Sequence, residues 1–464
     1  LSLAHLNYKM VPIKDLIGVG KNQITMDQVL LDDISFYAAE DADVVIELTE
    51  IFMKDLKKQK LFNYFKSIEI DLLPVLIDMQ FNGIFIDKDY LENRSNEIGK
   101  KIESLESEII DLAGEEFNLN SSQQLAVILF DKLKLPMIKK RSTAEAVLSE
   151  LKDKHPLPEL ILSYRKLYKL KNTYLDPLPS YIIADTQRVH SSFNQTMTAT
   201  GRLSTSSPNF QNIPIRTEDG KEIRKAIKAQ SHEYQIFSAD YSQVELRVMA
   251  HLSGDESLIS ALNNGEDIHT FTAKNIFNVD NDDMVLPEMR RIAKIVNFGI
   301  MYGAGPFRLS QELDIPFGEA KQIKDAYFEK YQGIEQYIEN SKLQIKETKS
   351  VETLLGRKRA VWDSDSQNKI RRDAAERMAI NMPIQGTAAE MIKLAMIKIH
   401  RQINKENLKS KLIMQIHDEL LLEVHQDEID YISKMVIEHM RDAMKLDVPI
   451  EIDFGVGPSW YEAH

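Results

Sequence analysis

Two aspartates stand beside apolar stretches that predict buried strands. The apolar stretch Gln235–Ala239 is expected to end as a strand at Asp240. Asp418 lies in the polar turn of an expected hairpin, between the apolar stretches Lys411–Ile416 and Leu420–Val424. A carboxylate at the edge of a buried sheet is costly unless a cation compensates it, and Mg²⁺ binds carboxylates together with substrate phosphates. If the strands pair, the residues suit two-metal phosphoryl displacement, with two ordinary turn aspartates as the alternative.

The stretch 287–302 carries a stripe of side chains that changes from cationic to aromatic. Four of its residues are spaced four apart: Arg290, Lys294, Phe298 and Tyr302. On a helix these side chains share one slowly rotating face. Two cations followed by two rings suit a polyphosphate at one end and a stacked base at the other. The stretch therefore predicts a helix that binds a nucleotide.

A second helical stretch presents donors for nucleic acid. Arg377, Asn381 and Gln385 are again spaced four residues apart. These side chains can reach base edges and sugar–phosphate groups. Pro383 lies within the same stretch and is expected to kink the helix.

Helical patterns separate the two strand regions and precede the first. Helices are predicted between them at Asp255–Asn264, Pro287–Tyr302, Gly318–Tyr331 and Arg371–Ile399. Strands separated by a long helical insertion are typical of an α+β fold with a sheet as its platform.

A helical arm with a basic tip is predicted before the first strand. Apolar residues recur mostly at steps of three and four between Leu91 and Leu112, which predicts a long helix. Ser121 and Gln124 have the spacing of a capping box that opens the next helix. Five cations follow: Lys132, Lys134, Lys139, Lys140 and Arg141. The pattern fits an arm that lies along a duplex, or a helical hairpin without a ligand.

The composition limits the class of protein. The 464 residues include no cysteine, which excludes disulfides, thiolate metal sites and cysteine nucleophiles. No stretch approaches the roughly 18 apolar residues of a membrane span. The formal net charge of −13 argues against a simple nucleic-acid binder. However, residues 131–171 hold 11 Lys and Arg against 5 Asp and Glu, and residues 421–464 hold 3 against 10. Such segregation allows a basic face on an acidic chain.

Six segments, in order along the chain, resemble motifs of the family A DNA polymerases. Three of them are similar to motifs A, B and C of that family: Asp240–Arg247, Arg290–Gly303 and Gln415–Glu419. The other three are Thr198–Ser204, Pro208–Pro214 and Gln385–Ala389. The resemblance covers essentially the whole chain, and it replaces the reading of Asp240 and Asp418 as ordinary turn residues.

The resemblance implies a catalytic centre with two Mg²⁺ ions, for which Mn²⁺ can substitute. Asp240 and Asp418 would hold the metals together with the backbone carbonyl of Tyr241, and Glu419 would lie beside them. Lys294 would protonate the departing pyrophosphate.

The resemblance also assigns a nucleotide site. Arg290, Lys294 and His269 would contact the incoming triphosphate, and Phe298 would pack against the sugar. Glu245 would exclude a 2′-hydroxyl, and Tyr302 would stack at the template position. Gln243 belongs to the same nucleotide-binding set.

The remaining implied roles concern DNA. Arg202, Asn381 and Gln385 would follow the minor groove near the primer terminus, where the acceptors are nearly the same for all base pairs. The other implied DNA contacts are Arg377, His417, Lys169 and Arg165, the last two at duplex phosphates. Pro177 stands where a lysine is common, which removes one expected duplex contact.

For the domains, the resemblance implies a right-hand polymerase of α+β class. Residues 1–60 would be the end of a 3′→5′ exonuclease-like domain and 61–464 the polymerase. Within it we expect the thumb at about 82–185, the palm at about 186–262 and 355–464, and the fingers at about 263–354.

The chain starts at Leu1, so we expect a fragment of a longer protein. Tyr37 and Asp41 match the last exonuclease motif, and the carboxylates of the earlier motifs are not in the sequence. We therefore expect no proofreading by this stretch.

The expected substrates are primer–template DNA and dNTPs, acted on by a cytoplasmic monomer without membrane partners, in a bacterium or in an organelle of bacterial descent. Three alternative functions are a single-subunit RNA polymerase, a polymerase-like DNA-binding protein without catalysis, and a two-metal nuclease. Glu245 disfavours the first, the combination of Asp240, Asp418, Arg290 and Lys294 the second, and the missing exonuclease carboxylates the third.

Overall fold

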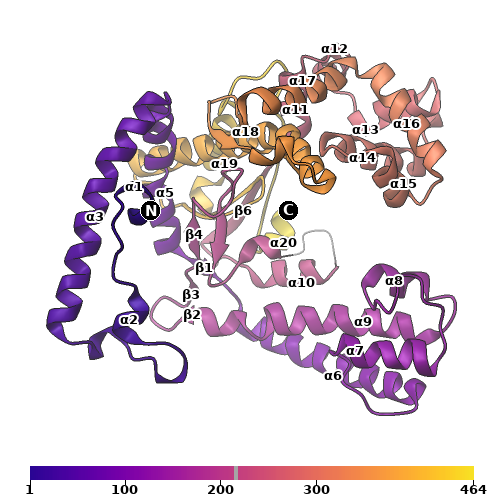
Figure 1. Ribbon diagram of the computed structural model, residues 1–464, viewed down its shortest axis with the longest axis horizontal. Helices are drawn as coiled ribbons and strands as arrows, with labels where there is room; N and C mark the ends of the chain where they lie inside the picture. Colours follow the sequence, from indigo (N-terminus) through magenta and orange to yellow (C-terminus); the bar gives the residue numbers. More distant parts are fainter. Residues whose placement is uncertain (214–217) are drawn as a thin grey trace. The chain divides into compact units, whose positions relative to one another are not determined.

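A computed structural model describes residues 1–213 and 218–464, so that Pro214, the last residue of one motif, lies outside the described residues. The chain divides into two compact units, one formed by Leu1–Asp71 with Glu352–Lys358 and the other by Leu72–Val351 with Arg359–His464. The functional domain limits given above remain a prediction. Each unit is described by itself (Figure 1).

The first unit is built on one long helix. Its helices are α1 (Ser2–His5), α2 (Ile13–Ile17), α3 (Leu31–Lys58) and α4 (Phe62–Tyr64). The buried Glu40 on α3 accepts hydrogen bonds from the Tyr8 hydroxyl (2.7 Å) and the Val11 amide (2.8 Å), which hold the N-terminal segment on the helix. Tyr37 and Asp41 lie on α3, and no group of three or more potential metal ligands occurs among the described residues. The absence of proofreading stays a prediction.

The second unit contains a four-stranded antiparallel sheet in the order β11–β6–β10–β9. Its strands are β6 (Tyr234–Tyr241), β9 (Lys411–Ile416), β10 (Glu419–His425) and β11 (Ile452–Gly457). The expected hairpin is confirmed, but its turn is shorter than predicted: Glu419 already belongs to β10, and only His417 and Asp418 connect the strands. The expectation that the first strand ends at Asp240 was also wrong. β6 runs one residue further because β11 pairs with it as far as Tyr241.

Side chains of β6 alternate between two cores, because successive residues of a strand point to opposite faces. Phe237, Ala239 and Tyr241 join the core that includes α18 (Lys369–Glu406) and α19 (Ile429–Arg441), whereas Ile236 joins the other core. The Tyr241 hydroxyl donates to the carbonyl of Met440 on α19 (2.8 Å), so this side chain faces away from Asp240. The sheet thus presents Asp240 on the face opposite to α19.

Helices precede, separate and follow the strands of this sheet along the chain. The first group is α5 (Leu73–Asn82), α6 (Lys88–Ala113), α7 (Ser122–Ala126), α8 (Glu145–Glu150), α9 (Pro156–Leu170) and α10 (Glu218–Ala226). The predicted long helix is confirmed as α6, which lies beside α9 (Figure 1). Ser121 caps α7 by accepting from the Gln124 amide (3.3 Å). The second hydrogen bond of the predicted capping box, from the Ser121 amide to the Gln124 side chain, is wrong. The Gln124 side chain accepts instead from the Asn118 amide (2.7 Å).

A second group of helices follows β6. Its members are α11 (Val244–Ser253), α12 (Glu256–Asn263), α13 (Ile268–Phe277), α14 (Pro287–Met301), α15 (Pro306–Leu313), α16 (Phe317–Lys330) and α17 (Gln332–Thr348). The helices predicted at 255–264, 287–302 and 318–331 correspond to α12, α14 and α16, with ends that differ by one residue.

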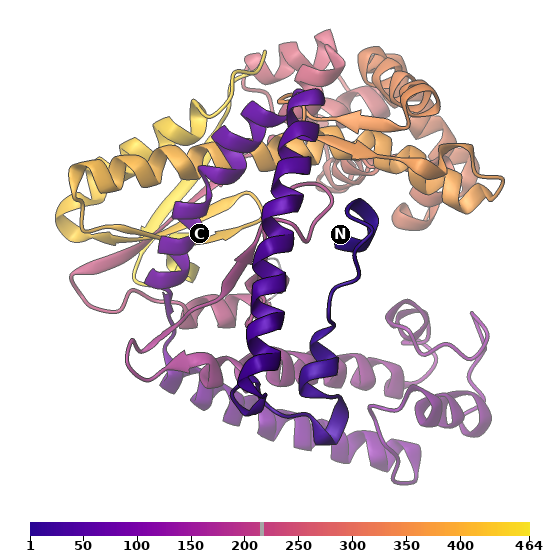
Figure 2. The same cartoon turned by 60° about the vertical axis from the view of Figure 1, so that its left-hand side comes forward.

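The last helices are α18 (Lys369–Glu406), α19 (Ile429–Arg441) and α20 (Trp460–Ala463). α18 and α19 lie side by side, and α19 packs on the sheet (Figure 2). α18 contains the predicted 371–399 helix and continues through Pro383, so the proline does not end it. The Tyr337 hydroxyl donates to the Ile380 carbonyl in the turn before Pro383 (3.1 Å), where a proline disturbs the helical hydrogen bonds.

Short strands complete the unit. β1 (Ile84–Phe85), β2 (Ile182–Ile183) and β3 (Arg188–Val189) form one small sheet, and β4 (Ser192–Asn194) pairs with β5 (Ser204–Ser206). β7 (Ser350–Glu352) pairs with β8 (Lys358–Ala360). The strands and helices together confirm the predicted α+β class. None of the described helices is both long enough and apolar enough to span a membrane.

Candidate active site

A cavity of about 750 Å³ opens at the end of β6 and β10. It gathers ten residues that the sequence placed in the site: Arg202, Asp240, Tyr241, Gln243, Glu245, Phe298, Tyr302, His417, Asp418 and Glu419. Four further residues line it: Ile213, Val244, Ile416 and His464. The cavity therefore brings together segments that lie far apart in the sequence.

The sheet register places acidic residues side by side. Asp240 lies directly opposite Glu419 on β10 and directly opposite Asp453 on β11, so all three side chains point to the same face. Asp418 precedes β10, and its backbone carbonyl accepts a hydrogen bond from the Tyr241 amide (3.2 Å). The predicted pairing that joins Asp240 to Asp418 is thus present.

This concentration of negative charge changes the acidity of both aspartates. Burial, together with the neighbouring charges of Glu419 and Asp418, raises the pKa of Asp240 to about 7. Burial likewise raises the pKa of Asp418 to about 6, although Arg202 acts in the opposite direction. Both carboxylates are therefore poorly compensated by the protein itself.

The donor set fits a divalent cation. The Asp240 carboxylate makes no hydrogen bond or ion pair with the described residues, and the nearest cation to Asp418 is Arg202 at 3.8 Å. Mg²⁺ characteristically takes one or two carboxylates and completes its shell with water and phosphate oxygens. Two carboxylates that face one cavity supply this set: Asp240 has no ion pair with the described residues, and Asp418 has only the 3.8 Å contact to Arg202. Tyr241 can contribute only its backbone, since its hydroxyl is bound at Met440.

Glu245, at the start of α11, links three elements. Its carboxylate accepts a hydrogen bond from the Tyr302 hydroxyl (2.6 Å) and forms an ion pair with Arg202. Glu245 itself is buried, so both partners approach it from the cavity side. In this state Arg202 is bound to protein carboxylates.

The graded stripe on α14 is present. The rings of Phe298 and Tyr302 are stacked, with centroids 6.5 Å apart, and both line the cavity. Arg290 instead forms a bidentate pair with Asp267, the N-cap of α13, at 3.0 and 2.7 Å. Although partial burial acts in the opposite direction, hydrogen bonds from Arg290 and Thr270 lower the pKa of Asp267 to about 2. Lys294 is half-buried and makes no ion pair with the described residues.

His269 lies between α13 and α14 and does not line the cavity. The side chain is 2% exposed, its Nδ1 lies 3.1 Å from the Asn297 amide nitrogen, and its ring contacts that of Phe298. Burial lowers the pKa of His269 to about 4, so the ring is neutral at physiological pH. Asn297 also bonds Thr272, which ties the two helices together.

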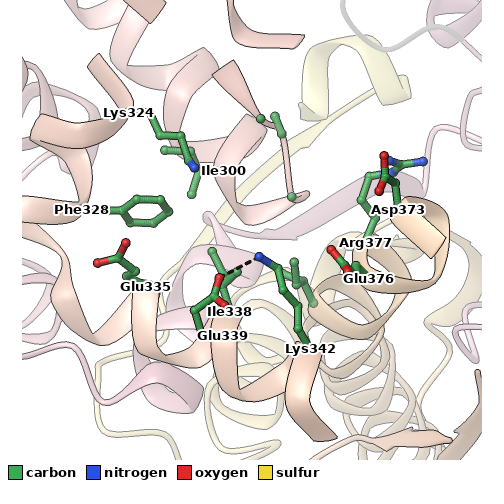
Figure 3. Close-up of a pocket in the computed structure, with 14 residues that line it drawn as sticks. Ile300, Lys324, Phe328, Glu335, Ile338, Glu339, Lys342, Asp373, Glu376 and Arg377 are labelled. Carbon is green, nitrogen blue, oxygen red and sulfur yellow. Dashed lines mark hydrogen bonds and ion pairs between the residues drawn. The ribbon is translucent and has the colours of Figure 1, made fainter. Parts of the chain in front are cut away.

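The residues assigned to DNA are distributed over several elements. Asn381 and Gln385 are half-buried on α18, and the buried Asn381 Oδ1 accepts no hydrogen bond from the described residues. Arg377, one turn earlier, lines a separate pocket of about 290 Å³ with Gly303 (Figure 3). His417 is exposed at the rim of the main cavity.

Two cations on α9, Arg165 and Lys169, differ in whether protein groups already bind them. Arg165 on α9 donates to the Thr143 carbonyl (2.5 Å) and contacts the Thr143 hydroxyl (3.4 Å), so this guanidinium already has protein partners. Lys169, one turn later, is exposed and makes no ion pair with the described residues.

Sequence reasoning gave no role to several residues that shape the site. Ser238, Trp460 and His464 contact Glu419, whereas Asp267 and Asn297 hold α13 and α14 together. The glycines Gly455 and Gly457, which allow α20 to approach the sheet, were the signal that could have revealed the first group.

Comparisons with known proteins agree with this geometry. The sequence model of the family described as "DNA polymerase family A" matches residues 88–462. DNA polymerase I of Pseudomonas aeruginosa is 42% identical over 471 residues, covering 100% of this chain and 51% of that protein. The thermostable DNA polymerase I of Thermus filiformis is 46% identical over 433 residues, covering 91% of this chain and 52% of that protein. The chain thus spans about half the length of these curated relatives.

A solved structure shares the fold. The "POL domain of Pol1 from M. smegmatis complex with DNA primer-template and dNTP" superposes with a TM-score of 0.87 at 39% identity, covering 91% of this chain and 75% of that one. This likeness confirms the polymerase fold that the motifs implied. The family model matches most of this chain, and residues of the family's motifs line the cavity. The chain therefore belongs to DNA polymerase family A.

Proposed function

We propose that this chain is a DNA-templated DNA polymerase that adds dNTPs to a primer 3′-hydroxyl and releases pyrophosphate, in replication-linked gap filling and repair. The observation that carries the proposal is the single cavity that Asp240 and Asp418 share with Glu245 and the aromatic end of α14. Family membership and the relatives' printed functions support the same activity.

Asp240 and Asp418, with the backbone carbonyl of Tyr241, would hold two Mg²⁺ ions, for which Mn²⁺ can substitute. When bound, such ions lower the pKa of a hydroxyl nucleophile and neutralise charge on the transferred phosphoryl group. Glu419, directly opposite Asp240, faces the same cavity.

The side chains of α14 would bind and orient the nucleotide. Arg290 and Lys294 carry positive charge on the same helical face as Phe298, which suits triphosphate at one end and sugar at the other. Lys294 would protonate the departing pyrophosphate. His269, being neutral and buried, would donate or accept a single hydrogen bond at the triphosphate.

Selection of the substrate would rest on Glu245 and Tyr302. Glu245 occupies the cavity wall where a 2′-hydroxyl would intrude, and Gln243 lines the cavity nearby. Tyr302, hydrogen-bonded to Glu245, would occupy the template position until the base arrives. Closure of α14 over the nucleotide would exclude water, an induced-fit step.

Primer–template DNA would lie along the remaining assigned residues. Arg202, Asn381 and Gln385 would follow the minor groove, where their N–H groups would donate to the base acceptors. Arg377 and His417 would contact the primer–template, and Lys169 and Arg165 the duplex phosphates. We further propose that the protein acts as a monomer in the bacterial cytoplasm.

A template-dictated incorporation assay tests the proposal. A labelled primer on four templates that differ in the first unpaired base is offered each dNTP and each rNTP separately with Mg²⁺. We expect only the complementary dNTP to be added on each template. Duplex binding without extension would instead support a non-catalytic binding protein, and preferred rNTP addition would support an RNA polymerase.

A further inference from the structure

Donors converge on one oxygen of Glu419. The Ser238 hydroxyl and the Trp460 indole N–H donate to Oε1 at 2.5 and 2.7 Å, and His464 Nδ1 lies 3.3 Å from the same atom. Glu419, Ser238 and Trp460 are each no more than 2% exposed. The other oxygen, Oε2, accepts no hydrogen bond from the described residues, while Glu419 lines the main cavity. The Glu419 carboxylate therefore has one oxygen, Oε1, held by several donors, and one, Oε2, without a hydrogen bond from the described residues.

The short helix α20, which supplies Trp460, packs closely against two glycines of β11. A Cβ on Gly455 of β11 would lie 2.5 Å from the Ala463 carbonyl oxygen, and one on Gly457 would lie 2.7 Å from the Glu462 Cβ. The two glycines are two residues apart and face the same side of the sheet. The Trp460 amide also donates to the Ile227 carbonyl (2.9 Å). The sequence thus removes the side chains that would keep α20 away from Glu419.

Burial of Trp460 in a core does not account for this arrangement. A core tryptophan needs one hydrogen-bond acceptor, and any backbone carbonyl could serve. Here the acceptor is a carboxylate directly opposite Asp240, and a second buried donor, Ser238, is aimed at the same oxygen. Hydrogen bonds to a charged group restrict its rotation more strongly than neutral ones. The arrangement fixes the direction of Oε2.

We propose that Trp460 and Ser238 are positioning residues for Glu419, and that α20 is part of the polymerase site: it holds Oε1 so that Oε2 points at the reacting groups. The proposal rests on the proposed function. Trp460 and Ser238 are not among the residues that line the main cavity. They act through the orientation of Glu419.

The chain offers a matched control for the test. It has two tryptophans, and Trp362 is 78% exposed whereas Trp460 is fully buried. In a Trp362→Phe background the isotope-labelled indole N–H of Trp460 gives a single NMR resonance. Glu419→Gln should shift this resonance if the indole donates to the carboxylate, a readout that does not depend on catalysis.

Kinetics then separate positioning from general stability. We expect Trp460→Phe, which keeps the ring but loses the N–H, to lower kcat about tenfold while the KM for dNTP and the Kd for duplex change less than about twofold. Trp362→Phe should leave all three unchanged. Ser238→Ala should repeat the effect and serves if Trp460→Phe misfolds. In a Glu419→Gln background neither substitution should lower kcat further, since positioning residues act through their target.

The outcomes are distinguishable. An unchanged kcat in Trp460→Phe and Ser238→Ala, or an equal fall in the Glu419→Gln background, would overturn the positioning role. An indole resonance unaffected by Glu419→Gln would overturn the contact itself. If the Trp362→Phe protein extends no primer, the proposed polymerase function fails, whereas the NMR result still decides whether α20 holds Glu419.

Discussion

The Tyr302 hydroxyl donates a hydrogen bond to the Glu245 carboxylate (2.6 Å), so the end of α14 is tied to the start of α11 across the cavity. Arg202 binds the other oxygen of Glu245. One carboxylate therefore links the end of α14, the start of α11 and Arg202, a residue proposed to contact DNA. Any nucleotide that enters must share the cavity with this linked group.

Removal of the Glu245 side chain is expected to relax sugar selection. Glu245→Ala opens the wall of the cavity where a 2′-hydroxyl would lie, and the ratio of rNTP to dNTP incorporation should rise at least about tenfold. Tyr302→Phe, which removes the hydrogen bond but leaves the carboxylate, should keep the ratio near that of the parent. Single-nucleotide incorporation kinetics measure both. Equal ratios in the parent and Glu245→Ala would contradict the assigned role.

His269 should make the free energy of unfolding depend on pH. Its folded pKa of about 4 lies below the ordinary value of 6.5 because the ring is buried. Between pH 6.5 and 4, His269 binds a proton in the unfolded chain but stays neutral in the folded protein. The stabilising contribution of neutral His269 is therefore complete above pH 6.5 and is lost as the pH falls toward 4.

The matching measurement is a series of urea titrations on the parent and His269→Gln. The stability difference between them should shrink or change sign in favour of the variant between pH 6.5 and 4. A difference that stays constant across this range would show that the ring is not held neutral.

How far the sequence predicts this structure depends on the range of the interaction. The alternation of Ile236, Ser238 and Asp240 against Phe237 and Ala239 fixes which face of β6 carries the carboxylate, because the pattern is local. The four-residue spacing on α14 likewise predicts the shared face of Phe298 and Tyr302.

Tertiary partners could not be predicted in this way. Arg290 meets Asp267 and Arg202 meets Glu245 across many residues of chain, and charge complementarity alone does not select one carboxylate among 71 acidic residues. For the same reason β6 extends past Asp240, since the pairing that extends it comes from the distant β11. Local reasoning also missed the Asn118 amide as the partner of Gln124.

Removal of one partner of a buried ion pair should strongly destabilise the second unit. Arg188 and Glu423 are both buried, 2.7 Å apart, and Arg188 also donates to Gln230 and to the Gly83 carbonyl. Arg188→Ala leaves Glu423 without its charge partner, which should cost about 3–5 kcal/mol in the free energy of unfolding.

The exposed pair Arg308–Glu312, at 2.8 Å, is the control. Arg308→Ala should cost no more than about 1 kcal/mol. Chemical denaturation of both variants tests the contrast, and similar losses in the two would refute the importance of burial.

Gly303, which follows Tyr302, should tolerate no side chain. It has a φ of +72°, and a Cβ there would lie 3.0 Å from Arg377 Cγ and 3.3 Å from Ile380 Cδ1. Gly303→Ala should destabilise the protein by about 1–2 kcal/mol through backbone strain. Because Arg377 must move, duplex affinity should fall as well.

Gly305 lies two residues further along, has no positive φ, and has open space around the Cβ position. Gly305 is the N-cap of α15, where glycine is preferred over alanine, so Gly305→Ala should cost up to about 1 kcal/mol but leave duplex affinity unchanged. Thermal unfolding and duplex titration compare the two variants. Equal losses of stability and of duplex affinity in Gly303→Ala and Gly305→Ala would argue against a steric role for Gly303.

The most direct measurement is single-turnover primer extension by the parent, Asp240→Asn and Asp418→Asn, with duplex affinity measured in parallel. Asparagine keeps the shape of each side chain and removes the charge that would hold the cations. We predict that both variants bind duplex as the parent does and extend the primer at least about 1,000-fold more slowly. Extension at the parental rate by either variant would contradict the assignment of the two carboxylates to the metal site.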